Sequence, residues 1–351
     1  MSDFAALPQP FARPDVVAAD LSPRAMSRAV AAGTLCVVSH RLYAVREGWE
    51  ERPAWVRHRL LAEAAVRLTK NASISQASDA ALLGLPHPTY PPARVSMTLM
   101  EDARTLRADS WRRFLRANTP YEHVQLREGV PRLAPARTVL DCTRELHPRD
   151  ALAIADGALR AGLVTHADLL AMRRHQRGWP QVRQSNDVLM LADGRRENWL
   201  ESVSAWSVHR WGLPVGIPQV NIVDGEGHLA GRADVLWPDQ GLVGEADGVQ
   251  KYLLDGATSD AVQHRLEQER VREQGFVRLG LGVVRWSPRE AIDGAQVYAR
   301  FRAAARGDGL MGVTAEFVCS CCDRPFRECV VEAELEQWRR LLTQEFAPKA
   351  W

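Results

Sequence analysis

Four acidic residues in the last third of the chain are spaced like carboxylates that could share one divalent cation. They are Glu201, Asp234, Glu245 and Asp247. Asp234 and Glu245 fall on two expected strands joined by one short turn, and adjacent antiparallel strands can bring two carboxylates side by side. Glu245 and Asp247 are two positions apart, so they point to the same face if the strand continues through both. Lys251 follows within a turn.

Carboxylates that share a face repel one another and raise each other's pKa, and a divalent cation relieves that repulsion. Mg²⁺ takes few carboxylates and completes its octahedron with water and phosphate oxygens. It would hold the scissile phosphate and lower the pKa of a bound water molecule. We therefore expect Glu201, Asp234 and Glu245 to bind Mg²⁺, Asp247 to act as an auxiliary acid, and Lys251 to position the water. The alternative is that these acidic residues are structural or are only solvated at strand ends.

The segment 186–295 has an element order that can position these side chains. Its pattern of apolar residues predicts a helix, three strands, a long helix and a final strand. These elements cover residues 197–211, 219–223, 232–236, 241–246, 260–279 and 283–286. Several strands followed by a crossover helix and a further strand indicate a mixed sheet flanked by helices. Glu201 lies on the first helix, which could pack at the strand ends.

The run ADVLWPDQGLVGEADGVQKY at 233–252 resembles the core of the restriction-endonuclease-like PD-(D/E)XK superfamily. It is more closely similar to a very-short-patch-repair-like domain found in many actinobacterial proteins. The residues that match its motifs are Glu201-Ser202, Asp234, Glu245, Asp247, Gly248, Lys251 and Tyr252, with a later helix at 269–273 and a strand at 283–286. This resemblance, over about 195–290, implies an α/β nuclease domain. Asp247 stands where typical members carry the catalytic lysine, so either Lys251 supplies that charge from another position or the site is weakened.

The first 50 residues have the element order of a winged helix. Ser22 is a good N-cap and Pro23 suits the first helical position, so a helix is expected over 23–32, ending at Gly33. A short helix at 15–19 precedes it, and two short strands, 34–38 and 42–45, follow it.

Residues 22–46 contain four arginines and no acidic residue. Contact with DNA phosphates needs such an unopposed positive surface. The residues expected to contact DNA are Arg24, Ser27, Arg28 and Arg41, and Ser27 and Arg28 could reach base edges in a major groove. The alternative is a solvated helix face on a small protein-interaction domain.

The run FARPDVVAADLSPRAMSRAVAAGTLCVVSHRLYAV at 11–45 resembles the winged helix of abortive-infection type IV antitoxins, often called AbiEi-type. The runs RLAPARTVLDCTREL and GALRAGLVTHADLL resemble the middle region that accompanies it. Over about 10–175, the resemblance implies operator binding to double-stranded DNA, autorepression and a cognate toxin as partner. The middle region itself predicts helices at 54–68, 75–83, 136–146, 150–161 and 166–173, and strands at 94–99 and 124–126.

The C-terminal tail holds four cysteines within eleven residues: Cys319, Cys321, Cys322 and Cys329. Four thiolates suffice for a tetrahedral Zn²⁺ site. Adjacent Cys321 and Cys322 can hardly both bind one ion without strain, so the candidate zinc ligands are Cys319, Cys322 and Cys329. The alternative is reduced thiols in a hairpin. An amphipathic helix at 332–346 is expected to dock on the body of the protein.

Composition limits the class of protein. The 351 residues are 46% hydrophobic and 25% charged, which argues against disorder, collagen and coiled coil. No apolar run is long enough to cross a bilayer, and the N-terminus lacks a signal-peptide pattern, so we expect a cytoplasmic protein with reduced cysteines and no membrane partner. The net charge is +2, so any basic patch must be local.

The expected fold is an α/β multidomain protein in four segments: a winged helix at 1–50, a mixed α+β region at 51–185, a restriction-endonuclease-like α/β domain with a mixed sheet at 186–295, and a helical tail with the cysteines at 296–351. The first functional hypothesis is a Mg²⁺-dependent DNA endonuclease. The second is an antitoxin-like repressor with a non-catalytic nuclease-like domain. A third is a protein-interaction module that neither binds nor cleaves DNA.

Overall fold

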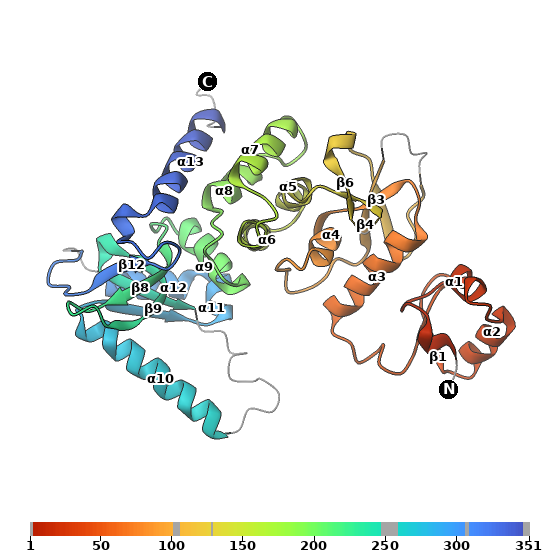
Figure 1. The fold of residues 1–351 in the computed structure, drawn as a ribbon, viewed down its shortest axis with the longest axis horizontal. Coiled ribbons are helices and arrows are strands. Elements are labelled where there is room, and N and C mark those ends of the chain that lie inside the picture. Colours follow the sequence, from red (N-terminus) through yellow and green to blue (C-terminus); the bar gives the residue numbers. More distant parts are fainter. Residues whose placement is uncertain (1–2, 101–105, 128, 247–258, 306–308, 347–351) are drawn as a thin grey trace. The chain divides into compact units, whose positions relative to one another are not determined.

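The computed structural model describes residues 3–100, 106–127, 129–246, 259–305 and 309–346 (Figure 1). The chain has a mixed α/β fold and forms two compact units, residues 1–145 and 146–351. The boundary between the units falls inside the segment predicted as one middle region. No described helix is both long and apolar enough to cross a membrane.

The first unit begins with short helices and a β-hairpin, in the predicted order. The elements are η1 (Asp3–Ala6), α1 (Arg13–Ala18), α2 (Pro23–Ala31), β1 (Leu35–Ser39) and β2 (Leu42–Val45). The side chain of Ser22 accepts a hydrogen bond from the backbone of Ala25, so the predicted N-cap is confirmed. Met26 of α2 packs into a small core with Phe11, Val16 and Leu35. This packing leaves the polar face of α2 exposed.

The rest of the first unit combines three helices with two small sheets. These elements are α3 (Ala54–Leu68), β3 (Ala72–Ile74), α4 (Gln76–Leu82), β4 (Val95–Leu99), β5 (Arg112–Leu115), η2 (Tyr121–His123), β6 (Val124–Arg127), β7 (Val130–Leu133) and α5 (Pro135–Glu145). In the three-stranded sheet, β4 pairs antiparallel with β3 and parallel with β5. The predicted helices and the strands β4 and β6 are confirmed, whereas β3, β5 and β7 were not predicted.

A buried histidine makes the stability of this unit depend on pH. His58 of α3 is 4% exposed, and its Nε2 lies 2.9 Å from the hydroxyl of Ser78 on α4. Burial lowers the pKa of His58 from 6.5 to about 4. The native state therefore holds the neutral imidazole, while the unfolded state takes up a proton at higher pH.

We expect this histidine to cost the first unit about 3 kcal/mol of stability as the pH falls from 6.5 to 4. Its contribution is present above pH 6.5 and is lost through that window, because protonation favours the unfolded chain. Urea unfolding of wild type and His58→Gln across this pH range measures the difference between their slopes. Identical pH dependence in the two proteins would contradict the assignment.

The second unit begins with four helices, which are followed by the strands of a five-stranded sheet. The helices are α6 (Pro148–Arg160), α7 (His166–His175), α8 (Gln184–Leu191) and α9 (Trp199–Arg210). The strands are β8 (Ile217–Val223), β9 (Leu229–Trp237), β10 (Leu242–Ala246), β11 (Gly282–Trp286) and β12 (Glu316–Cys319). The sheet order is β11-β10-β9-β8-β12, with β10 and β11 parallel and the other pairs antiparallel. The predicted mixed sheet is confirmed.

Two apolar layers cover the two faces of this sheet. On one face, α9, α11 (Pro288–Asp293) and α12 (Ala295–Ala304) pack with Trp237 and Trp286. The other face is covered by α10 (Ser259–Arg278) (Figure 1). Phe276 of this helix packs with Leu236 and Val243. The long crossover helix and its return strand β11 therefore have the predicted places.

The tail of the chain is part of the second unit. Its strand β12, which was not predicted, adds to the sheet edge by pairing with β8. The short helix η5 (Phe326–Glu328) leads into the last helix, α13 (Val330–Phe346). Another short helix, η3 (Pro238–Gln240), lies between β9 and β10. Trp338 of α13 donates a hydrogen bond of 2.8 Å to the carbonyl of Leu189 in α8. The predicted docking of this helix on the body is confirmed.

Candidate functional site

The residues predicted to contact DNA are all on the surface of the first unit. Arg24, Ser27 and Arg28 are exposed on α2, and Arg41 is exposed in the hairpin turn with a positive φ of 59°. The hydroxyl of Ser27 donates to the carbonyl of Pro23 at 3.2 Å, within its own helix.

Three of these residues are arginines, whose charge depends on whether acidic side chains lie nearby. Among the described residues, no carboxylate forms an ion pair with Arg24, Arg28 or Arg41. Arg46, the fourth arginine of this segment, differs because it pairs with Glu50 at 2.6 Å. Arg24 and Arg28 are one helical turn apart and lie on the same face of α2. The surface of α2 therefore carries positive charge that is available to an anion.

In the second unit, Glu201 is held in the first turn of α9. It is 6% exposed, and its carboxylate accepts hydrogen bonds of 2.9 Å from the backbone of Glu197 and from the side chain of Gln219, and a third from the amide of Asn198. Asn198 caps the helix by accepting from the backbone of Glu201. Burial, together with the charge of Asp234, raises the pKa of Glu201 to about 7.

Asp234 lies on β9 close to Glu201. Its Oδ2 accepts a hydrogen bond of 2.8 Å from the backbone nitrogen of Ala246 on β10. Both carboxylates line a small pocket together with Arg196, Ser204 and Trp286, among other residues. The cavity volume of about 30 Å³ is enough for an ion or for one or two water molecules. Two of the predicted metal ligands therefore share one site.

Glu245 points to the opposite face of the sheet. Side chains alternate along β10, so Gly244 and Ala246 face α9 while Val243 and Glu245 face α10. Glu245 is 4% exposed, and its carboxylate forms an ion pair of 2.5 Å with Arg272 of α10. The expectation that adjacent strands bring Glu245 beside Asp234 and Glu201 in one cluster is not met.

The remaining predicted catalytic residues, Asp247 and Lys251, lie outside the described residues, as do the motif residues Gly248 and Tyr252. Within the described part of the chain, no three acidic residues have carboxylate oxygens that all lie within 4.8 Å of one another. Glu201 and Asp234 alone therefore offer two carboxylates to Mg²⁺. The described residues do not complete the predicted magnesium site, and we derive no hydrolytic step from them.

Three residues that shape this region were not predicted. Gln219 reaches Glu201 because its backbone adopts a positive φ of 56° within β8, a distortion with no sequence signal. Arg196 lines the pocket and Arg272 binds Glu245. The helix predicted at 260–279 is rich in arginine and glutamate, but the sequence does not say which arginine meets a buried acid.

The cysteines of the tail gather in a set that differs from the prediction. The sulfur atoms of Cys319, Cys321 and Cys329 all lie within 4.8 Å of one another, so Cys321 takes the place predicted for Cys322. The reason is the turn after β12. It is closed by the backbone of Asp323 donating to Cys319 at 2.9 Å, and it brings the sulfur of Cys321 to 3.5 Å from that of Cys329.

Comparisons with known proteins give a partial match. No family model matches the chain. The chain is similar to two relatives named "Uncharacterized protein MT2308", from Mycobacterium tuberculosis strain CDC 1551 / Oshkosh, and "Uncharacterized protein Rv2248", from strain ATCC 25618 / H37Rv. Each is 31% identical over 118 residues, which is 33% of this chain and 43% of the relative. The match thus spans less than half the length of these relatives.

Proposed function

We propose that this protein binds double-stranded DNA through the exposed face of α2 and the β1–β2 turn, and that it acts as a repressor-like regulator. The observation that carries the proposal is the set of exposed arginines, Arg24, Arg28 and Arg41, with no acidic partner among the described residues. The helix, helix and hairpin order of a winged helix supports it.

The physical basis is the exchange of counterions on DNA for arginine side chains. Each arginine that reaches a phosphate releases condensed cations, which makes binding favourable and salt-dependent. A recognition helix lying in the major groove would direct Ser27 and Arg28 toward base edges, and Arg41 in the hairpin turn would reach the neighbouring backbone. A cognate toxin as partner and autorepression belong to the same proposal and rest on the resemblance to AbiEi-type antitoxins.

We expect Arg28→Ala to weaken binding to a DNA duplex by about 5- to 150-fold, since one arginine contact to a base edge is worth about 1–3 kcal/mol. Fluorescence anisotropy with a labelled duplex at fixed salt measures the effect. Arg340→Ala is the matched control, because Arg340 is an exposed helical arginine of the second unit. Equal affinity of Arg28→Ala and wild type would refute the proposed interface.

The second candidate function is Mg²⁺-dependent phosphodiester hydrolysis in the second unit. It is favoured by the pocket that Glu201 and Asp234 share, and it is opposed by the ion pair that holds Glu245 on the other face. Plasmid DNA incubated with Mg²⁺ and either wild type or Asp234→Ala separates the two functions. The repressor-like proposal predicts no cleavage by either protein, whereas cleavage by wild type that is lost in Asp234→Ala would establish the nuclease.

A further inference from the structure

Three thiols at the end of the sheet lie at the spacing that one metal ion requires. The sulfurs of Cys319, Cys321 and Cys329 are mutually within 4.8 Å, and those of Cys321 and Cys329 are 3.5 Å apart. Zinc–sulfur bonds of about 2.3 Å in a tetrahedron place sulfurs roughly 3.8 Å apart. The 3.5 Å separation and the upper bound of 4.8 Å are therefore compatible with a zinc thiolate site.

The fold builds this arrangement from a strand end and a helix start. Cys319 ends β12 and pairs with Val220 of β8, and its backbone nitrogen donates to the carbonyl of Arg324 at 2.8 Å. Cys329 stands directly before α13, and its carbonyl accepts from the backbone of Ala333. Strand β12 and helix α13 thus bring Cys319 and Cys329, which are ten positions apart in the sequence, close to each other.

The surroundings suit a bound ion that is shielded yet reachable. Cys319 and Cys329 are each 2% exposed, whereas Cys321 is open to solvent. All three are free thiols. The half-buried thiol of Cys322 lies near those of Cys321 and Cys329 but outside this group of three.

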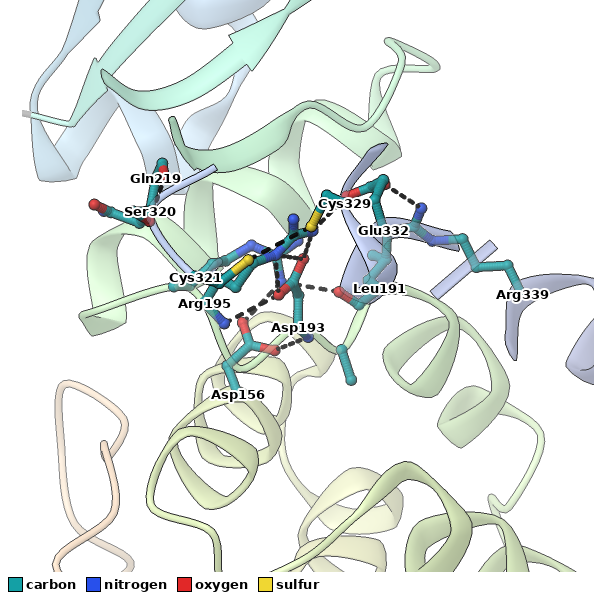
Figure 2. A network of polar contacts seen from close by, with 12 residues as sticks. Asp156, Leu191, Asp193, Arg195, Gln219, Ser320, Cys321, Cys329, Glu332 and Arg339 are labelled. Carbon is teal, nitrogen blue, oxygen red and sulfur yellow. Dashed lines mark hydrogen bonds and ion pairs between the residues drawn. The ribbon is translucent and has the colours of Figure 1, made fainter. Parts of the chain in front are cut away.

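A buried arginine lies next to the thiols. Figure 2 shows Arg195 beside Cys321 and Cys329, bonded to Asp193 and Glu332. The side chain of Arg195 is 8% exposed, and its ion pairs with Asp193 and Glu332 measure 2.7 and 2.6 Å. Hydrogen-bonded groups around the ligands orient them and balance their charge in metal sites. Burial raises the pKa of Cys319 and the charge of Arg195 opposes that rise, although Asp193 and Glu332 already pair with this guanidinium.

We propose that Cys319, Cys321 and Cys329 bind a Zn²⁺ ion. Thiolate sulfur selects Zn²⁺ over harder ions such as Mg²⁺. Each thiol loses its proton to solvent as its bond to zinc forms, so binding releases protons and involves no change of oxidation state. The ion would clamp β12 to the start of α13. This site is independent of the proposed DNA interface in the first unit.

The test is the zinc content of the purified full chain, measured by mass spectrometry of the metal after dialysis. We expect one zinc ion per wild-type chain and almost none in Cys319→Ser, Cys321→Ser or Cys329→Ser. Cys36→Ser is the matched control, because Cys36 is a buried thiol of the first unit that bonds the carbonyl of Ala44. The Cys36→Ser variant should keep its zinc.

Cobalt uptake by the metal-stripped wild-type chain tests the site without any substitution. Tetrahedral thiolate ligation of Co²⁺ gives intense charge-transfer and visible bands, which we expect to saturate at one equivalent and to disappear on adding zinc. Wild type that holds no zinc and shows no such bands would overturn the proposal. So would retention of zinc by Cys321→Ser, or a Cys321–Cys329 disulfide in protein purified under reducing conditions.

Discussion

Asp156→Ala is expected to destabilise the second unit by about 3–5 kcal/mol, because it removes the carboxylate from a buried ionic network. Asp156 on α6 is 1% exposed and binds Arg196, Ser202 and the backbone of Asp193 at 2.7–2.8 Å. Arg196 is 3% exposed, so the substitution leaves a guanidinium charge buried without this carboxylate. Urea unfolding followed by tryptophan fluorescence measures the loss.

The direction of the pKa shift of Asp156 indicates the balance between the cost of burial and the attraction of Arg196. Burial raises the pKa of this carboxyl, and the nearby Arg196 charge opposes the rise. Burying this ion pair therefore costs free energy, but removing one partner destabilises the protein more, because it leaves the other charge buried without its partner. Glu336→Ala is the control, since its 3.8 Å pair with Arg340 is exposed and should change stability by less than about 1 kcal/mol. A similarly small effect of Asp156→Ala would contradict this account of the core.

Asp79→Ala is expected to cost the first unit a similar amount, about 3–5 kcal/mol. Asp79 on α4 is fully buried, accepts a hydrogen bond of 2.5 Å from the hydroxyl of Thr138 on α5, and forms an ion pair with Arg132 on β7. Burial raises the pKa of Asp79, which Arg132 partly offsets. One carboxylate therefore links three separate elements.

The measurement for Asp79→Ala is again urea unfolding, with Glu63→Ala beside it. Glu63 lies on α3 in the same unit, and its 3.4 Å pair with Arg59 is exposed, so its loss should be nearly neutral. Asp79→Asn separates charge from hydrogen bonding, because it can still accept from Thr138. If Asp79→Ala unfolds at the same urea concentration as Glu63→Ala, the carboxylate does not hold these elements together.

Local signals predicted much of the fold. The Ser22-Pro23 start and the Gly33 end of α2 are stereochemical signals that act within a few residues, so the helix could be predicted from them. The apolar runs at 241–246 and 283–286 likewise predicted the strands β10 and β11, which the structure pairs in parallel. Strand β12 could not be predicted, because the short run Glu316–Cys319 becomes a strand only through its pairing with β8.

The candidate sites were harder to predict because they depend on which face each side chain takes. Alternation along β10 separates Ala246 from Glu245, but sequence alone does not say which helix covers which face. Glu245 therefore meets Arg272 of α10, whereas Glu201 comes from α9 on the other face. The cysteine set was misjudged for a similar reason, since the conformation of the turn at Asp323 decides which sulfur points toward Cys329.

The salt dependence of DNA binding tests the central claim most directly. A plot of log affinity against log salt has a slope that counts the phosphates contacted, about 0.9 for each. We predict that the combined variant Arg24→Ala, Arg28→Ala, Arg41→Ala binds more weakly than wild type and has a slope smaller by about 2–3. Equal slopes and equal affinities for the two proteins would show that these arginines do not contact the DNA backbone.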